Sequence, residues 1–304
     1  MPSQGIVEVL LSTYNGVRYL PELLESIWKQ EYPNITISVR DDGSVDGTDT
    51  LVAQLLLNRE GARFAAGKNL GVANSFLTLL ADVSEEARFA AFCDQDDVWM
   101  PTKLSRAVEA LAGIEGPALY CSAIQLVTDD LSTVGMYRRN VRGPSFANAL
   151  VENIATGCTI VLNREAIDLL RSRIPEQPVM HDAWCYLVVS AFGTIIYDEC
   201  AHTLYRLHES NAIGLAKTPV SDWTRRLIRH MKTGRERVFS RQASEFERVF
   251  GPILPEQTAS TLYTFLSARC RRVSRFRYAL SGEAYRQRRL DNAVFRVLFA
   301  LGRV

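Results

Sequence analysis

Short apolar runs alternate with amphipathic stretches through the first hundred residues of this chain, and each run ends in polar residues. Residues 6–11, 35–39 and 89–93 are rich in β-branched and aliphatic side chains with little alternation, which is typical of strands covered on both faces. Residues 20–28 place apolar side chains at helical spacing. Strands separated by such helices indicate right-handed βαβ units. The sequence therefore predicts an α/β fold with an open, mainly parallel sheet flanked by helices.

The same alternation continues to about residue 207. We expect further strands at residues 64–65, 118–127, 159–162, 194–197 and 203–207 and helices near residues 51–57, 71–80, 164–172 and 182–191. From about residue 220 the pattern is helical and basic, with breaks at Gly251, Pro252 and Pro255. We therefore predict a sheet domain over residues 1–217 and a mainly helical C-terminal region over residues 218–304.

Composition narrows the class of protein. The chain is 47% hydrophobic and 23% charged, which fits a soluble globular protein and excludes disorder, collagen and coiled coil. Its six cysteines are scattered without a C-x-x-C pair, as expected of thiols in a reducing compartment. No basic segment precedes the first apolar run, and residues 183–197 are too few to span a bilayer, which takes about 20 residues. We expect a cytoplasmic protein without a transmembrane helix.

The formal net charge of +1 hides a strong asymmetry between the two parts of the chain. Residues 221–304 carry 18 Lys and Arg against 7 Asp and Glu, whereas residues 1–220 carry 17 against 27. Basic amphipathic helices bind anionic membrane surfaces, so one interpretation is peripheral contact of residues 221–304 with the inner face of the cell membrane. The alternative is that these helices pack on the sheet domain with a solvated basic face. No base-reading motif accompanies the charge, and nucleic acid is not expected as a partner.

A cluster of three carboxylates follows the strand predicted at residues 89–93. Asp94, Asp96 and Asp97 would repel one another unless a cation or hydrogen-bond donors compensate their charge. Hard oxygen ligands of this kind suit Mg²⁺ or Mn²⁺ shared with substrate phosphates. The alternative is an acidic loop that caps the helix after Pro101. Because ligands gather at the carboxyl ends of strands in such sheets, the position favours the metal-binding interpretation.

A second polar cluster, Asp41-Asp42-Gly43-Ser44, follows the strand at residues 35–39. These are turn residues, and a tight turn would explain them. Two adjacent carboxylates can also accept hydrogen bonds from a nucleobase and from ribose hydroxyls. A dinucleotide-binding oxidoreductase would need a glycine-rich turn after the first strand, where residues 12–16 offer one glycine. A phosphatase with an aspartate nucleophile would need Asp where Ser12-Thr13-Tyr14 stands.

Several motifs in succession resemble the family 2 inverting glycosyltransferases of the GT-A fold, and most of all the bacterial rhamnosyltransferases of O-antigen and capsule synthesis. The motifs are Ser12-Thr13-Tyr14-Asn15-Gly16, Asp41-Asp42-Gly43-Ser44-x-Asp46-Gly47-Thr48, Lys68-Asn69-x-Gly71-x-x-Asn74, Asp94-Gln95-Asp96-Asp97-x-Trp99-x-Pro101-x-Lys103, His181-Asp182-Ala183-Trp184 and Tyr205-Arg206-x-His208. A weaker match at residues 285–292 extends the resemblance over most of the chain.

The resemblance implies a role for each matching position. The catalytic base would be Asp182, and Asp96 would ligate Mg²⁺ or Mn²⁺. His208 would touch the diphosphate or the metal, although a structural hydrogen-bonding role suits it equally. The nucleotide-sugar site would comprise Thr13, Tyr14, Asn15, Asp41, Asp42, Lys68, Asn69, Asn74, Asp94, Gln95 and His208.

These implications predict a metal-dependent inverting glycosyltransferase of bacterial surface polysaccharide synthesis. It would move a sugar, L-rhamnose by resemblance, from a nucleoside-diphosphate donor (dTDP-rhamnose or a UDP-sugar) to a saccharide acceptor linked to a polyprenyl lipid. Two alternatives stay open. A sugar-phosphate nucleotidyltransferase also uses a metal and aspartate pairs, but it would need a glycine-rich basic loop after the first strand, and that loop is missing. A catalytically inactive glycan-binding or scaffold protein would not need to retain Asp182.

Overall fold

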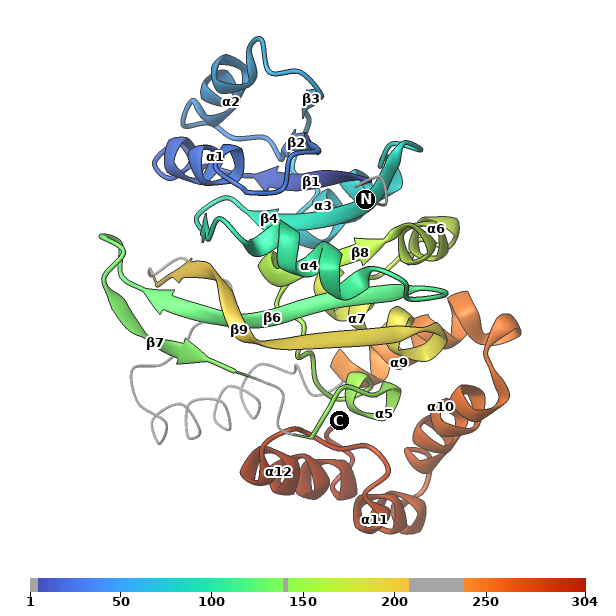
Figure 1. Ribbon diagram of the computed structural model, residues 1–304. Helices are drawn as coiled ribbons and strands as arrows, with labels where there is room; N and C mark the ends of the chain where they lie inside the picture. Colours follow the sequence, from blue (N-terminus) through green and yellow to red (C-terminus); the bar gives the residue numbers. More distant parts are fainter. Residues whose placement is uncertain (1–4, 139–141, 208–237) are drawn as a thin grey trace.

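The computed structural model describes residues 5–138, 142–207 and 238–304, and Figure 1 shows one curled sheet with helices on both sides. The strands are β1 (Ile6–Thr13), β2 (Ile35–Asp41), β3 (Ala62–Ala66), β4 (Ala87–Asp94), β5 (Val98–Trp99), β6 (Ala118–Val127), β7 (Thr133–Tyr137), β8 (Val161–Asn163) and β9 (Thr194–Arg206). The helices are α1 (Leu20–Trp28), α2 (Thr48–Leu56), α3 (Val72–Ala81), α4 (Lys103–Leu111), α5 (Phe146–Ala149), α6 (Arg164–Ser172), α7 (His181–Phe192), α9 (Val238–Phe250), α10 (Glu256–Ala268), α11 (Arg272–Ser281) and α12 (Arg289–Ala300). Two short 3-10 turns are η1 (Gly157–Thr159) and η3 (Gly251–Ile253).

The sheet has a parallel half and a mixed half. Its strand order is β3-β2-β1-β4-β8-β6-β9-β5, with β7 added to β6. The pairs β2/β3, β1/β2 and β1/β4 are parallel, as the alternating pattern predicts. From β8 onward directions mix, because β8 runs antiparallel to both β4 and β6 while β9 runs parallel to β6. The expected α/β architecture is confirmed, and the parallel half brings the ends of β1, β2 and β4 to one edge.

Two hydrophobic layers hold the sheet. Helices α1, α2 and α4 bury their apolar faces against one side, with Leu23, Ile27 and Leu104 at 0% exposure. Helices α3, α6 and α7 cover the other side. The strands β1 and β4 are therefore buried on both faces, which explains why their sequences are continuous apolar runs rather than alternating ones.

The predicted strands at residues 194–197 and 203–207 form a single long strand, β9. The polar residues between them read as a break, but they form a bulge in the pairing with β6, where Ser122 pairs with Asp198 and Ala123 with Ala201. Asp198 is satisfied inside the bulge, since its carboxylate accepts hydrogen bonds from the Tyr120 hydroxyl (3.0 Å) and the Cys200 amide (2.8 Å). The strand therefore continues past a carboxylate that would otherwise end it.

Asn163 and Gly193 fix the corner where α6, α7 and β6 meet. The Asn163 side chain caps α6 by accepting from the Ala166 amide (3.0 Å), accepts from the Ala118 amide (2.8 Å) and donates to the Gly116 carbonyl (2.8 Å). Gly193 ends α7 against β6, and a Cβ there would lie 1.8 Å from the Pro117 carbonyl oxygen. Only glycine fits this close backbone approach.

The C-terminal helices pack on the sheet domain. Phe246 and Phe250 of α9 each lie 6.1 Å, centroid to centroid, from the Trp184 ring of α7, and residues of α9 to α12 belong to the same hydrophobic cluster as α3, α6 and α7. The predicted boundary at residues 217 and 218 lies outside the described residues and stays a prediction. Among the described residues, no helix combines the length and hydropathy needed to cross a bilayer.

Candidate active site

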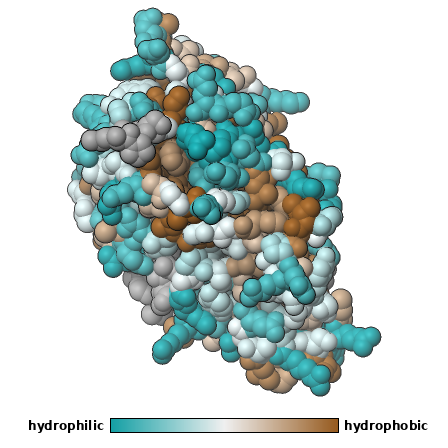
Figure 2. All heavy atoms as spheres, turned by 45° about the vertical axis from the view of Figure 1, so that its right-hand side comes forward, coloured by the Kyte–Doolittle hydropathy of each residue, from teal (hydrophilic) through white to brown (hydrophobic). Residues whose placement is uncertain are grey.

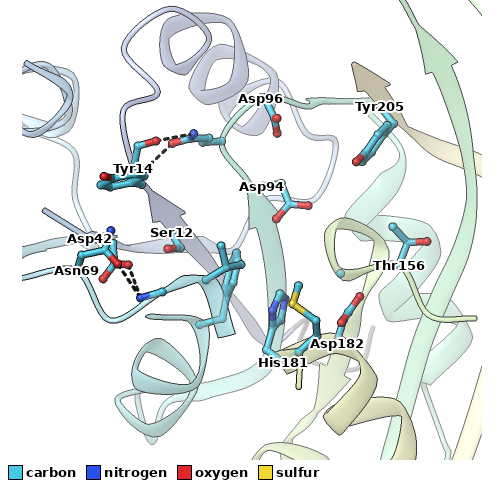
Figure 3. A pocket seen from close by; sticks show the side chains of 16 residues that line it. Ser12, Tyr14, Asp42, Asn69, Asp94, Asp96, Thr156, His181, Asp182 and Tyr205 are labelled. Atoms are coloured by element: carbon cyan, nitrogen blue, oxygen red, sulfur yellow. Dashed lines mark hydrogen bonds between the residues drawn. The ribbon is translucent and has the colours of Figure 1, made fainter. Parts of the chain in front are cut away.

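A cleft of about 390 Å³ opens at the carboxyl edge of the parallel strands. It lies between the ends of β1, β2 and β4, the start of α7 and the turn η1 (Figure 3). The residues that line it are Ser12, Tyr14, Asp42, Asn69, Gly71, Val72, Phe76, Asp94, Gln95, Asp96, Thr156, Gly157, Met180, His181, Asp182 and Tyr205. Tyr14, Asp42, Asn69, Asp94, Gln95, Asp96 and Asp182 are thus the predicted site residues that the fold brings together.

Acidic side chains from two distant parts of the chain face this cleft. Asp94 ends β4, Asp96 follows it in the loop, and Asp182 lies in the first turn of α7. In Figure 3, Asp94 lies between the other two carboxylates. Burial, together with the charges of Asp96 and Asp182, raises the pKa of Asp94 to about 7, and the charge of Lys103 opposes that shift. Carboxylates gathered in a partly dry cleft favour a cation or a substrate with many hydrogen-bond donors.

The chemistry of this donor set fits a hard divalent cation. Asp94 and Asp96 offer carboxylate oxygens, the ligands that Mg²⁺ and Mn²⁺ prefer. Asp97 and Cys158 lie beside Asp94, but both are buried behind the cleft. Burial raises the pKa of the Cys158 thiol well above its usual value, so the sulfur stays protonated and is a poor metal ligand.

A buried lysine lies beneath the acidic loop. Lys103 is 1% exposed, and its ammonium donates to the Cys158 carbonyl oxygen at 2.6 Å and lies 3.3 Å from the centre of the Trp99 ring. Burial lowers its pKa to about 8, and the charges of Asp97 and Asp94 oppose that shift. Lys103 thus supplies positive charge near Asp97, which accepts no hydrogen bond from nitrogen or hydroxyl donors among the described residues. It also ties α4 to the turn that lines the cleft.

Two aromatic rings hold the start of α7 in place. The His181 ring stacks on Phe76 with centroids 4.0 Å apart and meets the edge of Phe92 at 5.0 Å. Burial lowers the pKa of His181 to about 4, so the imidazole is neutral near pH 7. The neighbouring Asp182 carboxylate accepts from the Ala183 amide at 2.7 Å. This packing fixes the backbone from which Asp182 faces the cleft.

Asp42 lines the wall of the cleft opposite Asp182 and holds the loop before α3 in place. Its carboxylate accepts hydrogen bonds from the Leu70 amide (2.8 Å) and the Gly71 amide (2.9 Å) and pairs with the buried Arg40 guanidinium. Arg40 also donates to the Lys68 carbonyl oxygen at 3.0 Å. Asp42 therefore shapes the loop before α3, which presents Asn69 and Gly71 to the cleft.

Other predicted nucleotide-site residues lie behind or beside this wall. Thr13 is fully buried and donates to Asp41 at 2.8 Å, and Asp41 also accepts from the Ser44 amide and hydroxyl. Asn15 accepts from the Val45 amide at 2.9 Å and so joins the loops after β1 and β2. The remaining ones are Lys68 and Asn74, which are exposed outside the cleft lining, and His208, which lies outside the described residues.

Tyr14 and Gln95 form a pair at the mouth of the cleft. The Tyr14 amide donates to the Gln95 side-chain oxygen at 2.8 Å, and the Gln95 side-chain nitrogen donates to the Tyr14 carbonyl at 3.0 Å (Figure 3). The Tyr14 side chain is 48% exposed. These two bonds hold the loop after β1 against the acidic loop, leaving the aromatic ring beside the opening.

Several residues of the lining have no role that was predicted from the sequence. Phe76 and Met180 are apolar, as core residues are, and Thr156 belongs to no charged cluster. Four others, Ser12, Gly71, His181 and Tyr205, stand inside the motifs quoted above, which was the available signal for them. The full set without an assigned role is Ser12, Gly71, Val72, Phe76, Thr156, Gly157, Met180, His181 and Tyr205.

The fold and the acidic cleft at its strand ends define an α/β transferase of the GT-A type. Comparison with solved structures agrees on the fold: S. aureus TarS 1–349 is similar with a TM-score of 0.57 at 16% identity, covering 91% of this chain and 73% of that one. The sequence model of glycosyl transferase family 2 matches residues 8–168. The chain belongs to this family, and the protein is a glycosyltransferase.

The chain is similar to two curated relatives with named activities. The dTDP-rhamnosyl transferase RfbG of Shigella flexneri is 26% identical over 219 residues, which cover 67% of this chain and 73% of that protein. The UDP-Glc:alpha-D-GlcNAc-diphosphoundecaprenol beta-1,3-glucosyltransferase WfgD of Escherichia coli is 27% identical over 217 residues, which cover 68% and 79%. These similarities favour a glycosyltransferase over the nucleotidyltransferase and inactive alternatives.

Proposed function

We propose that the protein transfers a sugar, with inversion, from a nucleoside-diphosphate donor to a hydroxyl of a saccharide acceptor. One observation carries the proposal: the Asp182 carboxylate faces the same cleft as the Asp94 and Asp96 pair, from a different wall. An inverting transfer needs this arrangement, because the base must lie on the opposite side of the anomeric carbon from the leaving diphosphate. In this cleft, Asp94 and Asp96 on one wall could hold the cation and the diphosphate, and Asp182 on another wall could act as the base.

In the proposed mechanism, Asp182 accepts the proton of the acceptor hydroxyl as its oxygen attacks the anomeric carbon. General base catalysis of this kind contributes about 10²–10⁴-fold. The bond to the diphosphate breaks on the far side, so the configuration inverts. The loop held by Asp42 and the pair Tyr14 and Gln95 would bind and orient the nucleotide. When bound to Asp96 and Asp94, Mg²⁺ or Mn²⁺ would neutralise charge on the diphosphate.

For the substrates we propose dTDP-rhamnose or a UDP-sugar as donor and a polyprenyl-linked saccharide as acceptor, in bacterial surface polysaccharide synthesis. The similarity to a dTDP-rhamnosyl transferase supports the first donor, and the similarity to a glucosyltransferase named for a diphosphoundecaprenol acceptor supports a UDP-sugar and a lipid-linked acceptor. An acceptor of that kind would place the enzyme at the inner face of the cell membrane.

Replacement of the base tests the proposal most directly. Asp182→Asn should lower kcat by about 10²–10⁴-fold while donor binding, measured by calorimetry with the nucleoside diphosphate, stays within about twofold. Asp49→Asn in α2, outside the cleft, is the matched control and should keep full activity. Transfer by Asp182→Asn at the normal rate would show that another group takes the proton.

The metal is tested separately. Asp96→Asn and chelation with EDTA should each weaken binding of the nucleoside diphosphate, and added Mg²⁺ or Mn²⁺ should restore binding to the chelated native protein but not to the variant. Equal binding of the nucleotide with and without EDTA would refute a metal role for this acidic loop.

A further inference from the structure

Helices α11 and α12 carry exposed apolar side chains at helical spacing on the side away from the protein. They form the lower end of the molecule in Figures 1 and 2, where apolar surface lies among projecting polar side chains. Each of six large residues there is between 59% and 74% exposed. Together we call them the apolar stripe: Val273, Phe276 and Leu280 on α11, Leu290 and Val297 on α12, and Leu301 at the C-cap of α12.

The opposite faces of both helices are firmly packed. Tyr278 of α11 and Phe299 of α12 lie 4.8 Å apart between ring centroids, and both contact Phe265 of α10 at 5.9 and 5.6 Å. All three are at most 5% exposed. The side chains of the apolar stripe therefore point outward, because the opposite face of each helix is already packed against neighbouring helices. The stripe is not a poorly packed part of the core.

Arginines border the stripe. Residues 269–304 contain ten arginines and two acidic residues. On α11, Arg272 and Arg277 lie on either side of the stripe by helical spacing, and both are exposed. Long cationic side chains beside an apolar helix face are typical of helices that lie in the interface of an anionic bilayer.

We propose that the apolar stripe and its bordering arginines form a docking surface for a leaflet of anionic phospholipid. Charge decides between occupants. A second copy of this chain, seated symmetrically on the stripe, would bring the exposed arginines of one copy, among them Arg272 and Arg277, against those of the other. Residues 208–237 are themselves basic, with seven Lys and Arg against three acidic residues, so they do not complement the surface. Lipid phosphates supply the opposite charge, and acyl chains accept the apolar side chains.

The connection between α11 and α12 links this surface to the chain that leads into the cleft. The Gln287 side chain donates to the Gly143 carbonyl at 2.9 Å, and its amide donates to Glu152 at 2.6 Å. The Tyr285 carbonyl accepts from Asn148 at 2.9 Å. Four residues after Glu152, Thr156 lines the cleft. Docking at the stripe would thus hold the cleft at a fixed position relative to the lipid surface, which suits a lipid-linked acceptor if the proposed function is correct.

Vesicle binding of the full chain tests the docking surface. In flotation assays the native protein should bind vesicles of phosphatidylcholine mixed with phosphatidylglycerol, should bind phosphatidylcholine alone much less, and should be released by salt. Phe276→Ser with Leu290→Ser should weaken binding about 100-fold, since two large apolar side chains no longer enter the bilayer. Arg272→Gln with Arg277→Gln should weaken it about 30-fold.

Matched variants separate the surface from general charge and folding. Arg272→Lys with Arg277→Lys keeps both charges and should bind as the native protein does. Val45→Ser with Leu57→Ser removes two exposed apolar residues far from the stripe and should change nothing. Thermal melting of each variant reports folding. Native-like binding by the Phe276 and Leu290 variant, or no binding by the native protein, would overturn the proposal, as would a shift from dimer to monomer in that variant without vesicle binding.

Flotation uses no sugar transfer, so its failure is distinct from failure of the proposed activity. A protein that transfers sugar to a water-soluble acceptor but ignores vesicles would refute only the docking surface. A protein that binds vesicles but releases no nucleoside diphosphate would refute only the proposed reaction.

Discussion

Replacement of His181 by phenylalanine should remove a large part of the acid sensitivity of this fold. The imidazole is 2% exposed, stacks on Phe76 and has no hydrogen-bond partner for either ring nitrogen among the described residues. Burial lowers its pKa to about 4 from 6.5 in the unfolded chain. Between these values the unfolded chain takes up a proton that the folded protein does not, so stability falls as pH falls through 6.5 toward 4.

The magnitude follows from the two pKa values. At pH 8 the imidazole is neutral in both states and contributes no pH dependence. At pH 5 the unfolded chain is almost fully protonated at His181 while the folded protein is not, which destabilises the fold by about 2 kcal/mol. At pH 4 and below the difference approaches about 3 kcal/mol. His181→Phe has no such group, and its ring fits the same aromatic stack.

Urea denaturation of the native protein and the variant at pH 8 and pH 5 measures the effect. The quantity to compare is the decrease in the free energy of unfolding from pH 8 to pH 5. This decrease should be about 2 kcal/mol smaller in the variant than in the native protein. Asp94, whose pKa burial raises to about 7, titrates in the same range with the opposite sign, but it is common to both proteins and cancels. Phe246→Leu, a core substitution whose ring contacts do not include His181, is the control and should keep the native pH dependence. An equal decrease in the free energy of unfolding from pH 8 to pH 5 in His181→Phe and in the native protein would refute the reasoning.

Three substitutions test the packing that supports the cleft, each by urea denaturation at pH 8. Gly193→Ala should destabilise by about 3 kcal/mol, because the added methyl group meets the Pro117 carbonyl oxygen; an unchanged midpoint would contradict that close approach. Asn163→Ala should cost about 3 kcal/mol through the lost helix cap and two backbone groups left without their partner, the buried Ala118 amide and the partly buried Gly116 carbonyl; a loss under 1 kcal/mol would argue against the three-bond corner. Phe246→Ala should cost about 3–5 kcal/mol, whereas a negligible effect would mean that α9 is not part of the core.

The strands of the parallel half could be predicted because burial on both faces leaves a continuous apolar run in the sequence. Strand β9 could not be, since the bulge at Asp198 depends on partners in β6 that lie about 78 residues away in sequence. The local pattern of apolar residues indicates which faces of a segment are buried. They do not report whether a distant hydroxyl or amide will satisfy a carboxylate inside it.

Some residues of the cleft could likewise be predicted from the sequence, and others could not. Asp94 and Asp96 could be placed at a strand end from the sequence, whereas Asp182 was linked to them only through family resemblance. Phe76 could not be recognised, because a lining aromatic residue has the same helical spacing as a core residue. Asp41 stays a predicted nucleotide contact. What the sequence did not predict is that its oxygens accept hydrogen bonds from Thr13 and Ser44, an arrangement that depends on two loops meeting in space.

The hydrogen bonds from the α11–α12 connection to residues 143–152 limit how this protein can be recombined with its relatives. A chimera that exchanged only the last helices would leave Asn148 and Glu152, both at most 8% exposed, facing a foreign segment without Tyr285 and Gln287. A functional exchange would have to carry residues 143–152 together with the C-terminal helices. This end of the enzyme is therefore one structural unit made of two segments that are far apart in sequence. Chimeras whose crossover points separate these segments should be unstable.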